Sequence, residues 1–399
     1  MSARPTVRVI IVNWRNPALT LRAARSIAPQ LGAGDHLVLV DNGSGDDSAA
    51  VIGGGLDALR GAAAGARVSL VENPVNAGFG AGVAAGAGGA DEDAIALLNN
   101  DAIVDGGYLD ALLAPLGTTR GGAEVGATTA LILLSGTWRP LAPGEDRPHL
   151  VARDGARWTR LGDDETGEGA VLVNSTGNLV DASGNGYDRD WLSPARGLDA
   201  PADVFGVCGG ACAVSRRAWE AVGGIRTDLF MYYEDTDLSW RLREAGYAAV
   251  YVSGAVARHD HAASSGTGSP MFIRVNARNR LVVAAEHAPA RVVASALARS
   301  LVRAARVLER GGSSAASVRR RLERAGGALG YEELRLQQLV WAGAGLVATL
   351  GGGMLLALVR PVNAPALIAA SLLAALSGAA GRDWWLSREV ERRRRRIEA

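Results

Sequence analysis

Four short apolar segments, each ending in asparagine or aspartate, constrain the fold of this chain more than any other feature. They read VRVIIVN (7–13), HLVLVDN (36–42), ARVSLVEN (66–73) and AIALLNND (94–101). Continuous β-branched and aliphatic runs of this length are typical of strands buried on both faces of a sheet. Asn16 and Pro17 follow the first run as a helix N-cap and a first-turn proline, and predict a helix to about Gln30. Strands that alternate with helices predict parallel βαβ units and a doubly wound α/β sheet.

Polar side chains gather where these predicted strands end. They are Asn13, Asp41, Asn42, Glu72, Asn73, Asn99, Asn100 and Asp101. In sheets of this kind, ligands bind at the carboxyl ends of the strands. Solvation alone does not require acids and amides at one edge on four strands, so the sequence predicts a binding site there.

Composition limits the class of protein. The chain has 399 residues and a formal net charge of +1, which allows one large domain with additions and does not favour nucleic acid as a partner. Cys208 and Cys212 lie in an apolar glycine-rich run, so we expect small buried side chains rather than a disulfide. The N-terminus lacks the apolar stretch of a signal peptide before the first strand, which favours a cytoplasmic catalytic part.

Two further regions differ from this pattern. Residues 135–200 are rich in Gly, Pro, Asp and Arg, and predict a long irregular segment of the kind that forms binding loops or lids. Residues 229–247, LFMYYEDTDLSWRLREAGY, place acids directly before an amphipathic helix that ends at Gly246.

The acids of this second region exceed what a helix start needs. We assign capping to Thr236 or Asp237, which leaves Glu234 and Asp235 at the N-terminal approach of the helix. The helix dipole and free amides there favour ionised carboxylates. These two acids are therefore candidates for chemistry.

Five motifs in order carry a family resemblance: VDNGSGD, NPVNAGFGAG, LLNND, MYYEDTDLSWRLREAGY and RHDH. Over roughly residues 7 to 285 the chain resembles the inverting family 2 glycosyltransferases of GT-A fold, especially their rhamnosyltransferase-like branch. The resemblance implies the GT-A nucleotide-diphospho-sugar transferase fold. It also implies transfer of one sugar, with inversion, from a nucleoside-diphosphate donor.

The resemblance assigns donor binding to the strand ends and the loop after the third strand. The matching residues are Val12, Asn13, Asp41, Asn42, Asn76, Gly78, Asn99, Asn100 and Asp101. An alternative for Asp41 is an Asx-turn within DNGS. NAGFGAG could likewise be only a tight loop entering a packed helix.

LLNND occupies the position of the family's Asp-x-Asp metal motif, with Asn99 in place of the first aspartate. Asp101 is then the one carboxylate for Mg²⁺ or Mn²⁺, and donor phosphates would complete the shell. The family's histidine ligand is matched best by His259, with His261 as second choice. The alternatives are a helix N-cap at Asp101 and a surface loop for the histidines.

The same resemblance makes Asp235 the catalytic base, with Glu234 organising the acceptor or orienting the base. Gly209 and Gly210 match a glycine-containing strand on the acceptor side. The Gln/Arg-x-x-Arg-Trp motif of processive members is absent from the sequence, so we expect single-sugar transfer.

Two other classes of function compete with this interpretation. GAGVAAG (80–86) fits a loose dinucleotide-binding pattern with Asp101 as ribose ligand, which would make an NAD-dependent oxidoreductase. The weakened NND motif would also suit a membrane-bound, non-catalytic nucleotide-sugar-binding subunit.

The chain changes character after about residue 285. One helical face would carry Arg299, Arg303, Arg306 and Arg310, and the opposite face Val293, Leu297, Leu301 and Leu308. Such a basic amphipathic helix suits an anionic membrane surface or packs on the catalytic domain. Residues 339–359 and 361–381 carry no charge and predict a transmembrane hairpin with cytoplasmic ends. The alternative is a helix pair that packs on itself or on a partner subunit.

These observations predict three parts: a GT-A catalytic domain (1–285), a basic helical linker (286–337) and a membrane hairpin with a basic tail (338–399). We expect a metal-dependent hexosyltransferase of cell-envelope polysaccharide synthesis at the cytoplasmic face of the plasma membrane. Its expected donor is a dTDP- or UDP-sugar, with dTDP-L-rhamnose as first choice from the resemblance. Its expected acceptor is a glycan or a polyprenyl-diphosphate-linked sugar.

Overall fold

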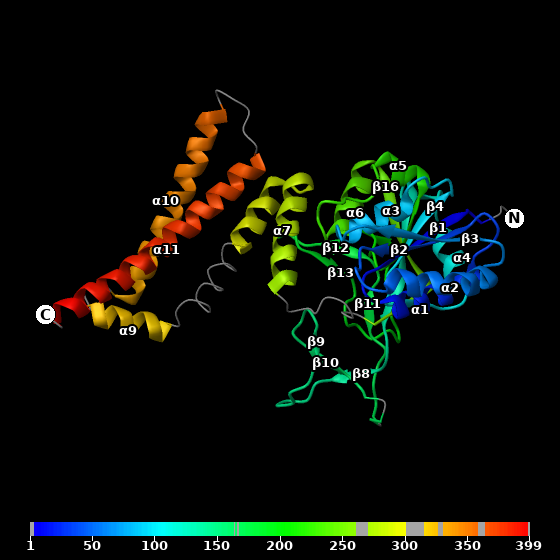
Figure 1. The fold of residues 1–399 in the computed structure, drawn as a ribbon, viewed down its shortest axis with the longest axis horizontal. Coiled ribbons are helices and arrows are strands. Elements are labelled where there is room, and N and C mark those ends of the chain that lie inside the picture. Colours follow the sequence, from blue (N-terminus) through cyan, green and yellow to red (C-terminus); the bar gives the residue numbers. More distant parts are fainter. Residues whose placement is uncertain are drawn as a thin grey trace. The chain divides into compact units, whose positions relative to one another are not determined.

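The fold is described from a computed structural model of the chain. It covers residues 4–162, 164–165, 167–260, 270–300, 315–325, 330–357 and 364–397. The chain divides into two compact units, Met1–Arg299 and Ser300–Ala399, and each is considered by itself (Figure 1).

The first unit is built on a mixed sheet whose strand order is β14-β16-β7-β15-β4-β1-β2-β3. Its four parallel strands are those predicted: β1 (Val7–Asn13), β2 (His36–Asn42), β3 (Arg67–Asn73) and β4 (Ala94–Leu98). Their register aligns Asn13 with Asp41, and Asp41 with Glu72. The polar strand ends therefore meet at one edge of the sheet, as the sequence indicated.

Antiparallel pairing extends the sheet beyond β4. β15 (Ala211–Ser215) runs antiparallel to β4 and to β7 (Ala123–Leu134), and β16 (Tyr247–His259) lies parallel to β7. The short strand β5 (Ala102–Val104) pairs with the end of β16, opposing His259 to Ala102. This pairing brings the histidine beside the NND motif. The remaining edge strands are β6 (Thr119–Arg120), β11 (Val173–Ser175) and β14 (Asp203–Val204).

Helices cover both faces of the sheet because alternate strand residues point to opposite sides. Val9 and Ile11 pack with α1 (Pro17–Ile27), α2 (Ser48–Ala62) and α4 (Tyr108–Leu113) on one face. Ile10 packs on the other face with α3 (Phe79–Ala87), α5 (Arg216–Ala221) and α6 (Glu234–Glu244). The predicted first helix ends at Ile27 and continues as a 3-10 turn, Ala28–Gln30.

The glycines of GAGVAAG lie inside helix α3 instead of in a strand-to-helix turn. A Cβ at Gly82 would lie 2.7 Å from Val12 Cγ1, and one at Gly86 would lie 2.7 Å from Ile10 Cγ2. These glycines let α3 approach the sheet closely. The dinucleotide-binding interpretation is therefore wrong.

The segment predicted to be irregular contains short strands. β8 (Trp138–Pro140), β10 (Arg157–Arg160) and β9 (Leu150–Val151) form a separate three-stranded sheet, and β12 (Asn178–Val180) pairs with β13 (Gly186–Asp188). Tryptophans 138, 158 and 191 pack around buried leucines beneath the small sheet. Short strands and dense turn residues hid this regularity in the sequence. Both cysteines are free, as expected, and Cys212 is buried.

The first unit ends with α7 (Pro270–His287) and a further helical stretch that begins at residue 290. The described part of the second unit contains α9 (Ala315–Ala325), α10 (Tyr331–Ala357) and α11 (Ala364–Ile397). Among the described residues, α10 alone is long and apolar enough to cross a bilayer, by length and composition. Part of the second predicted span, 361–381, lies outside the described residues, as do His261, Leu301, Arg303, Arg306, Leu308 and Arg310.

α10 and α11 pack through glycines. A Cβ at Gly345 would lie 2.6 Å from the Ala374 carbonyl oxygen, and one at Gly378 would lie 2.4 Å from that of Trp341. The two backbones therefore approach as closely as small residues permit, which is typical of helix pairs in membranes.

Gly86→Ala should lower the free energy of unfolding by about 1–3 kcal/mol, because its methyl group would overpack α3 against Ile10 and Val40. Gly54→Ala is the matched control, since Gly54 lies in exposed helix α2 with nothing within 4 Å of its Cβ position. That control should stabilise the protein by about 0.5–1 kcal/mol. Urea unfolding measures both changes, and equal effects would contradict the packing described.

Candidate active site

The first part of the site is a buried network at the ends of β1 and β2. Asn13 Nδ2 donates to Asp41 Oδ1 at 2.8 Å, and Thr20 Oγ1 donates to Asn13 Oδ1 at 2.8 Å. The Ser44 amide donates to Asp41 Oδ2 at 3.2 Å, and its hydroxyl to Oδ1. The alternative of a turn within DNGS is thus confirmed for Asp41.

The loop after β3 is fixed to β2 by amide side chains. Asn42 Nδ2 donates to Asn76 Oδ1 at 3.2 Å and to the Gly78 carbonyl at 2.9 Å, while Asn73 Nδ2 donates to Asn42 Oδ1. Gly78 has φ of 101°, and a Cβ there would lie 2.0 Å from the Phe230 carbonyl oxygen. A glycine is required at this close approach. The loop therefore joins the strand ends to the segment before α6.

The NND motif and the predicted histidine lie together. His259 Nε2 is 2.9 Å from Asp101 Oδ1 and 3.3 Å from Asn99 Nδ2. On the other side of the ring, Nδ1 lies 2.7 Å from Asn174 Oδ1. Because an amide oxygen only accepts, Nδ1 carries the proton of that bond, and Nε2 is directed at Asp101. Asn100 instead donates to Thr20 Oγ1, at 3.3 Å.

Asp101 does not cap a helix, so that alternative is wrong: it precedes β5, and α4 begins only at Tyr108. His259 Nε2 and Asp101 Oδ1 are a nitrogen and an oxygen of the kinds that bind divalent ions, and they lie next to one another. An amide that fixes the opposite ring nitrogen is typical of a metal-bound histidine. The residues present therefore fit a divalent ion that takes further oxygen ligands from a diphosphate.

Helix α6 begins three or four residues earlier than the predicted cap at Thr236 or Asp237 implies. Its N-cap is Tyr233 in the left-handed conformation, with φ of 76° and no side-chain cap, so Glu234 and Asp235 form the first turn. Capping by Thr236 or Asp237 is therefore wrong. Asp237 is buried and its Oδ2 accepts from Arg241 Nε at 2.8 Å. The left-handed residues before the helix, which sequence rules disfavour for tyrosine, account for the difference.

Asp235 is held by three donors. Its Oδ2 accepts from the Gly209 amide at 3.0 Å, and its Oδ1 from the amide and hydroxyl of Thr236 at 2.7 and 3.3 Å. Removal from water raises the pKa of Asp235, although these hydrogen bonds act in the opposite direction. The expectation that the helix N-terminus lowers the proton affinity of this acid is wrong, because desolvation dominates.

Glu234 is buried, and its Oε1 has no hydrogen-bond partner in the described part of the chain. Burial raises the pKa of Glu234 to about 8, and the negative charge of Asp235 adds to the effect. This carboxyl group therefore holds its proton near neutral pH. A protonated acid beside an ionisable aspartate can donate a hydrogen bond while its neighbour accepts a proton.

The chain passing from Gly209 to Gly210 joins both halves of the site. The Gly209 amide binds Asp235, and the Gly210 carbonyl accepts from the Asn99 amide at 2.9 Å. A Cβ at Gly209 would lie 3.3 Å from Asp235 Cβ, and one at Gly210 would lie 3.4 Å from Asn99 Nδ2. Asp235 and Asn99 of the NND motif thus border the same two residues. The region around this glycine pair is the candidate cleft.

Sequence reasoning missed Asp188, at the end of β13. Burial raises the pKa of Asp188 to about 6; the charge of Asp235 adds to this, whereas Ser175, Cys208 and the charge of His259 act against it. Asp188 is therefore close enough to both Asp235 and His259 to interact with them electrostatically. Its position within the segment predicted to be irregular gave no signal in the sequence.

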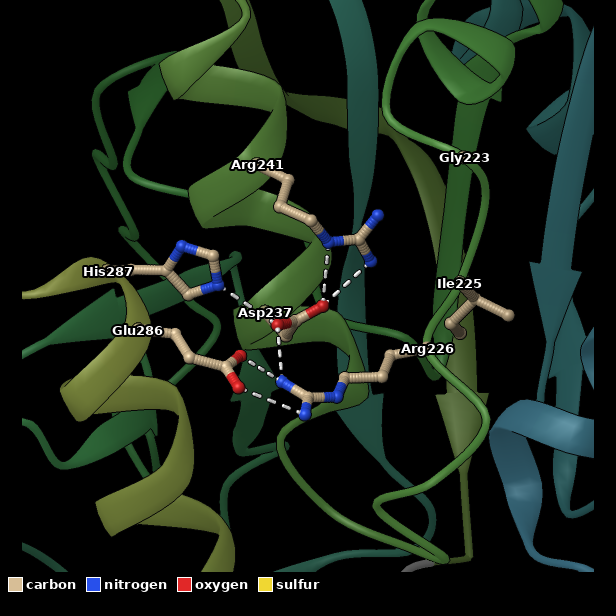
Figure 2. Close-up of a pocket in the computed structure, with 7 residues that line it drawn as sticks. All are labelled: Gly223, Ile225, Arg226, Asp237, Arg241, Glu286 and His287. Atoms are coloured by element: carbon tan, nitrogen blue, oxygen red, sulfur yellow. Dashed lines mark hydrogen bonds and ion pairs between the residues drawn. The ribbon is translucent and has the colours of Figure 1, made fainter. Parts of the chain in front are cut away.

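A second group of possible metal ligands lies outside this cleft: Asp237, Glu286 and His287 (Figure 2). They border a cavity of about 290 Å³ that is also lined by Arg226 and Arg241. Arg241 Nη2 is 2.7 Å from Asp237 Oδ2, and Arg226 pairs with Glu286. Two guanidinium groups already neutralise these carboxylates, so the cluster does not fit a cation. It joins α6 to α7.

Comparison with known families decides the class of the protein. Residues 5–284 match the family model described as "Glycosyltransferase like family 2". The chain belongs to this glycosyltransferase family. Its mixed sheet with helices on both faces is accordingly the GT-A glycosyltransferase fold.

Curated relatives of this family 2 glycosyltransferase match over a short stretch. The N-acetylglucosaminyl-diphospho-decaprenol L-rhamnosyltransferase of Mycobacterium tuberculosis (strain CDC 1551 / Oshkosh) is 47% identical over 58 residues, 14% of this chain and 19% of that protein. The protein of the same description in strain ATCC 25618 / H37Rv matches equally. The match thus spans about one fifth of these relatives.

Solved structures similar to this family 2 glycosyltransferase include GalNAc-T7 with UDP, GalNAc and Mn2+, at 17% identity and a TM-score of 0.49, covering 71% of this chain and 48% of that one. Another is the mannosyltransferase PcManGT from Pyrobaculum calidifontis in complex with GDP-Man and Mn2+. It has 17% identity and a TM-score of 0.46, covering 96% and 88%.

Glu234→Gln should stabilise the enzyme at alkaline pH. Between its usual pKa of 4.5 and about 8, the folded state holds a proton at Glu234 that the unfolded chain releases, so the stability of the wild type falls as pH rises. Each pKa unit corresponds to about 1.4 kcal/mol. The melting temperature of the variant should therefore exceed that of the wild type at about pH 9, by more than at about pH 5.

Glu220→Gln, at an exposed position of α5, is the control and should leave both melting temperatures unchanged. A Glu234→Gln variant that melts lower than the wild type at both pH values would show that this carboxyl group is not a buried acid.

Proposed function

We propose that the protein transfers one sugar, with inversion, from a nucleoside-diphosphate donor to an acceptor hydroxyl. The observation that carries the proposal is that Asp235 and Asn99 of the NND motif border the same glycine pair, Gly209 and Gly210. Inverting transfer requires a base on the acceptor side and charge stabilisation on the leaving-group side. Asp235 suits the first role, and the NND motif with His259 suits the second.

Asp235 acts as the base that accepts the proton of the attacking hydroxyl. The Gly209 and Thr236 amides orient its carboxylate, and its raised pKa makes it a better base than an exposed aspartate. Glu234, protonated near neutral pH, donates a hydrogen bond that organises the acceptor or the base. In-line positioning supplies much of the rate.

Asp101 and His259 would hold Mg²⁺ or Mn²⁺ on the leaving-group side. Such an ion supplies Lewis-acid stabilisation of the charge that grows on the departing diphosphate. Asn13, Asp41 and Asn42 bind the nucleoside, and the loop of Asn76 and Gly78 closes against it. Asn99 and Asn100 supply further amide donors on the same side of the site.

The donor of first choice is dTDP-L-rhamnose, with UDP-sugars as the alternative nucleotide class. The acceptor is a glycan or a polyprenyl-diphosphate-linked sugar in cell-envelope polysaccharide synthesis. Two observations support this choice: the ordered motifs of the rhamnosyltransferase-like branch, and a matching relative that is named as a rhamnosyltransferase with a diphospho-decaprenol acceptor.

The second unit holds the enzyme at the cytoplasmic face of the plasma membrane. α10 has 27 residues, or about 40 Å of helix, against a hydrocarbon core of about 30 Å. Leu339, Val347 and Leu355 are 68, 69 and 68% exposed along it. The exposed Trp384 and Trp385 of α11 suit the interface between lipid and water.

Purified enzyme should release nucleoside diphosphate from a dTDP- or UDP-sugar when Mn²⁺ and membrane extract are present. Asp235→Asn should lower kcat by about 10²–10⁴-fold because the general base is lost. Asp57→Asn, whose side chain is 94% exposed, is the matched control and should leave kcat unchanged. If the wild type binds nucleotide-sugars yet neither hydrolyses nor transfers them, the non-catalytic subunit is the correct alternative.

Full-length protein should sediment with phosphatidylglycerol vesicles. Leu339→Asp with Leu355→Asp should reduce the bound fraction several-fold, because each charge at a bilayer core costs about 2.5–3.5 kcal/mol. Val51→Asp with Val151→Asp, at exposed positions of the catalytic unit, is the control and should bind as the wild type does. Equal binding by all three proteins would exclude lipid contact through α10.

A further inference from the structure

The five residues before the acid pair, 229–233, form a strained loop. Phe230, Tyr232 and Tyr233 have φ of 72°, 68° and 76°, which is the left-handed region. Side chains with a Cβ rarely adopt this conformation, and it persists only where surrounding contacts determine it. The conformation of this loop is therefore stabilised by the residues that pack against it.

This loop contacts both halves of the cleft. The Phe230 carbonyl accepts from the Phe79 amide at 2.7 Å, next to Gly78 of the donor-side loop. Tyr233 is the N-cap of α6, and its carbonyl accepts from the Asp237 amide at 2.9 Å. Residues 229–233 therefore contact the donor-side loop at one end and lead into the first turn of α6, which carries Glu234 and Asp235, at the other.

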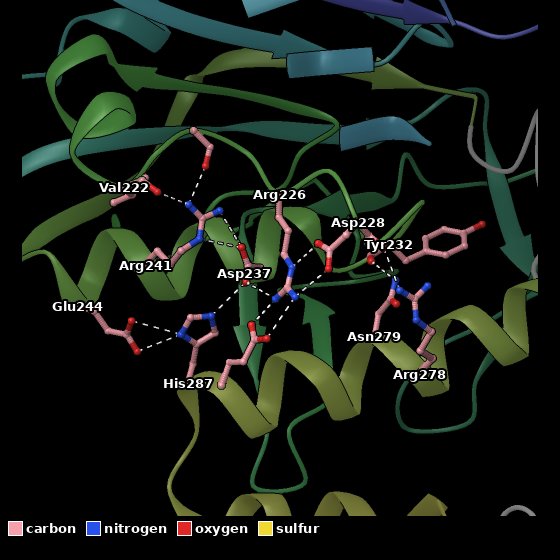
Figure 3. A network of polar contacts seen from close by, with 12 residues as sticks. Val222, Arg226, Asp228, Tyr232, Asp237, Arg241, Glu244, Arg278, Asn279 and His287 are labelled. Atoms are coloured by element: carbon pink, nitrogen blue, oxygen red, sulfur yellow. Dashed lines mark hydrogen bonds and ion pairs between the residues drawn. The ribbon is translucent and has the colours of Figure 1, made fainter. Parts of the chain in front are cut away.

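Helix α7 supplies the contacts that determine the loop, chiefly through Asn279 (Figure 3). Asn279 is fully buried, and its Nδ2 lies 3.0, 2.9 and 2.8 Å from the carbonyl oxygens of Leu229, Met231 and Tyr232, so its two N–H groups are shared among three acceptors. Its Oδ1 has no hydrogen-bond partner in the described structure. A buried amide that leaves its own acceptor unsatisfied is placed for its donor group.

Other residues on the same face of α7 reinforce this contact. Arg278 Nη2 donates to the Asp228 carbonyl at 2.9 Å, and Phe272 packs edge-to-face on Tyr232 at 5.0 Å between ring centroids. At the C-terminal end, Glu286 pairs with Arg226, and His287 Nε2 lies 3.0 Å from Asp237 Oδ1. Helix α7 therefore contacts the chain both before the loop, at Arg226 and Asp228, and after it, at Asp237.

We propose that Asn279 is a positioning residue for sugar transfer: it holds loop 229–233 in the left-handed conformation that aims Asp235 at the cleft and seats the donor-side loop. This inference rests on the proposed function. Asn279 touches neither donor nor acceptor and acts through the loop. A neutral amide suits the task, because an ammonium group would bury a charge, and a carboxylate would repel the three carbonyl oxygens.

The experiment compares Asn279→Ala with Asn276→Ala in the full-length protein. Asn276 is the matched control, since it lies one turn earlier on α7 and its Nδ2 donates only within the helix, to the Phe272 carbonyl at 2.9 Å. Two readouts are measured: hydrogen exchange of the Phe79 and Gly209 amides, which report the donor-side loop and the base, and kcat with KM for the donor.

Asn279→Ala should accelerate exchange of both amides by at least about tenfold while the central strands β1 and β2 exchange as in the wild type. It should lower kcat by at least about tenfold because the base is misaligned, and it should raise KM for the donor because the donor-side loop is loosened. Asn276→Ala should change neither readout.

Wild-type exchange at both amides in Asn279→Ala, or acceleration spread evenly through the sheet, would overturn the proposal. If Asn279→Ala does not fold, Asn279→Ser replaces it, since a short hydroxyl side chain also removes the amide donor from the loop carbonyls. It should accelerate exchange of the same amides, and wild-type exchange there would overturn the proposal. If the wild type shows no transfer, the proposed function is wrong. Hydrogen exchange of the Phe79 and Gly209 amides still tests whether Asn279 holds the loop.

Discussion

A hydrogen bond from the Gly209 amide to the Asp235 carboxylate connects the two halves of the candidate site of this glycosyltransferase. Gly209 enters β15, which pairs with β4 and so shares its edge with the NND motif. Asp235 belongs to a helix whose start depends on a left-handed loop. The helix packs on the sheet through Leu238 and Leu242, and this bond fixes the carboxylate of Asp235 beside the glycine pair.

Removal from water determines the direction in which the pKa values of the acids in this site shift. Desolvation raises the pKa of Glu234, Asp235 and Asp188, although helix start, amides and hydroxyls all favour the ionised forms. The cleft can therefore hold one acid protonated beside another that accepts a proton. Asp237, two residues further, shows the opposite outcome: burial raises its pKa, but His287 and Arg241 outweigh the burial and lower it.

Much of the donor side could be predicted from the sequence because local signals determine it. Buried parallel strands require continuous apolar runs, and their polar ends fall at one edge, so Asn13, Asp41 and Asp101 were placed together correctly. The pairing of β5 with β16 then brings His259 to Asp101. That contact followed only from the family resemblance, since nothing local joins residues so far apart.

The acceptor side could be predicted less well, for physical reasons. Tyrosines in the left-handed conformation contradict local propensity, so the start of α6 and the role of Asp237 were misjudged. The pKa directions of Glu234 and Asp235 depend on burial by distant segments. Asp188 and Asn279 act through tertiary contacts that carry no periodic or motif signal.

The most direct test of the shared cleft is a crystal structure of the protein with Mn²⁺ and a nucleoside diphosphate. The account predicts that the ion contacts Asp101 and His259, that the diphosphate bridges it, and that Asp235 faces the position of the transferred sugar. An ion held by Asp237, Glu286 and His287, or a diphosphate bound on the far side of the sheet from Asp235, would contradict it.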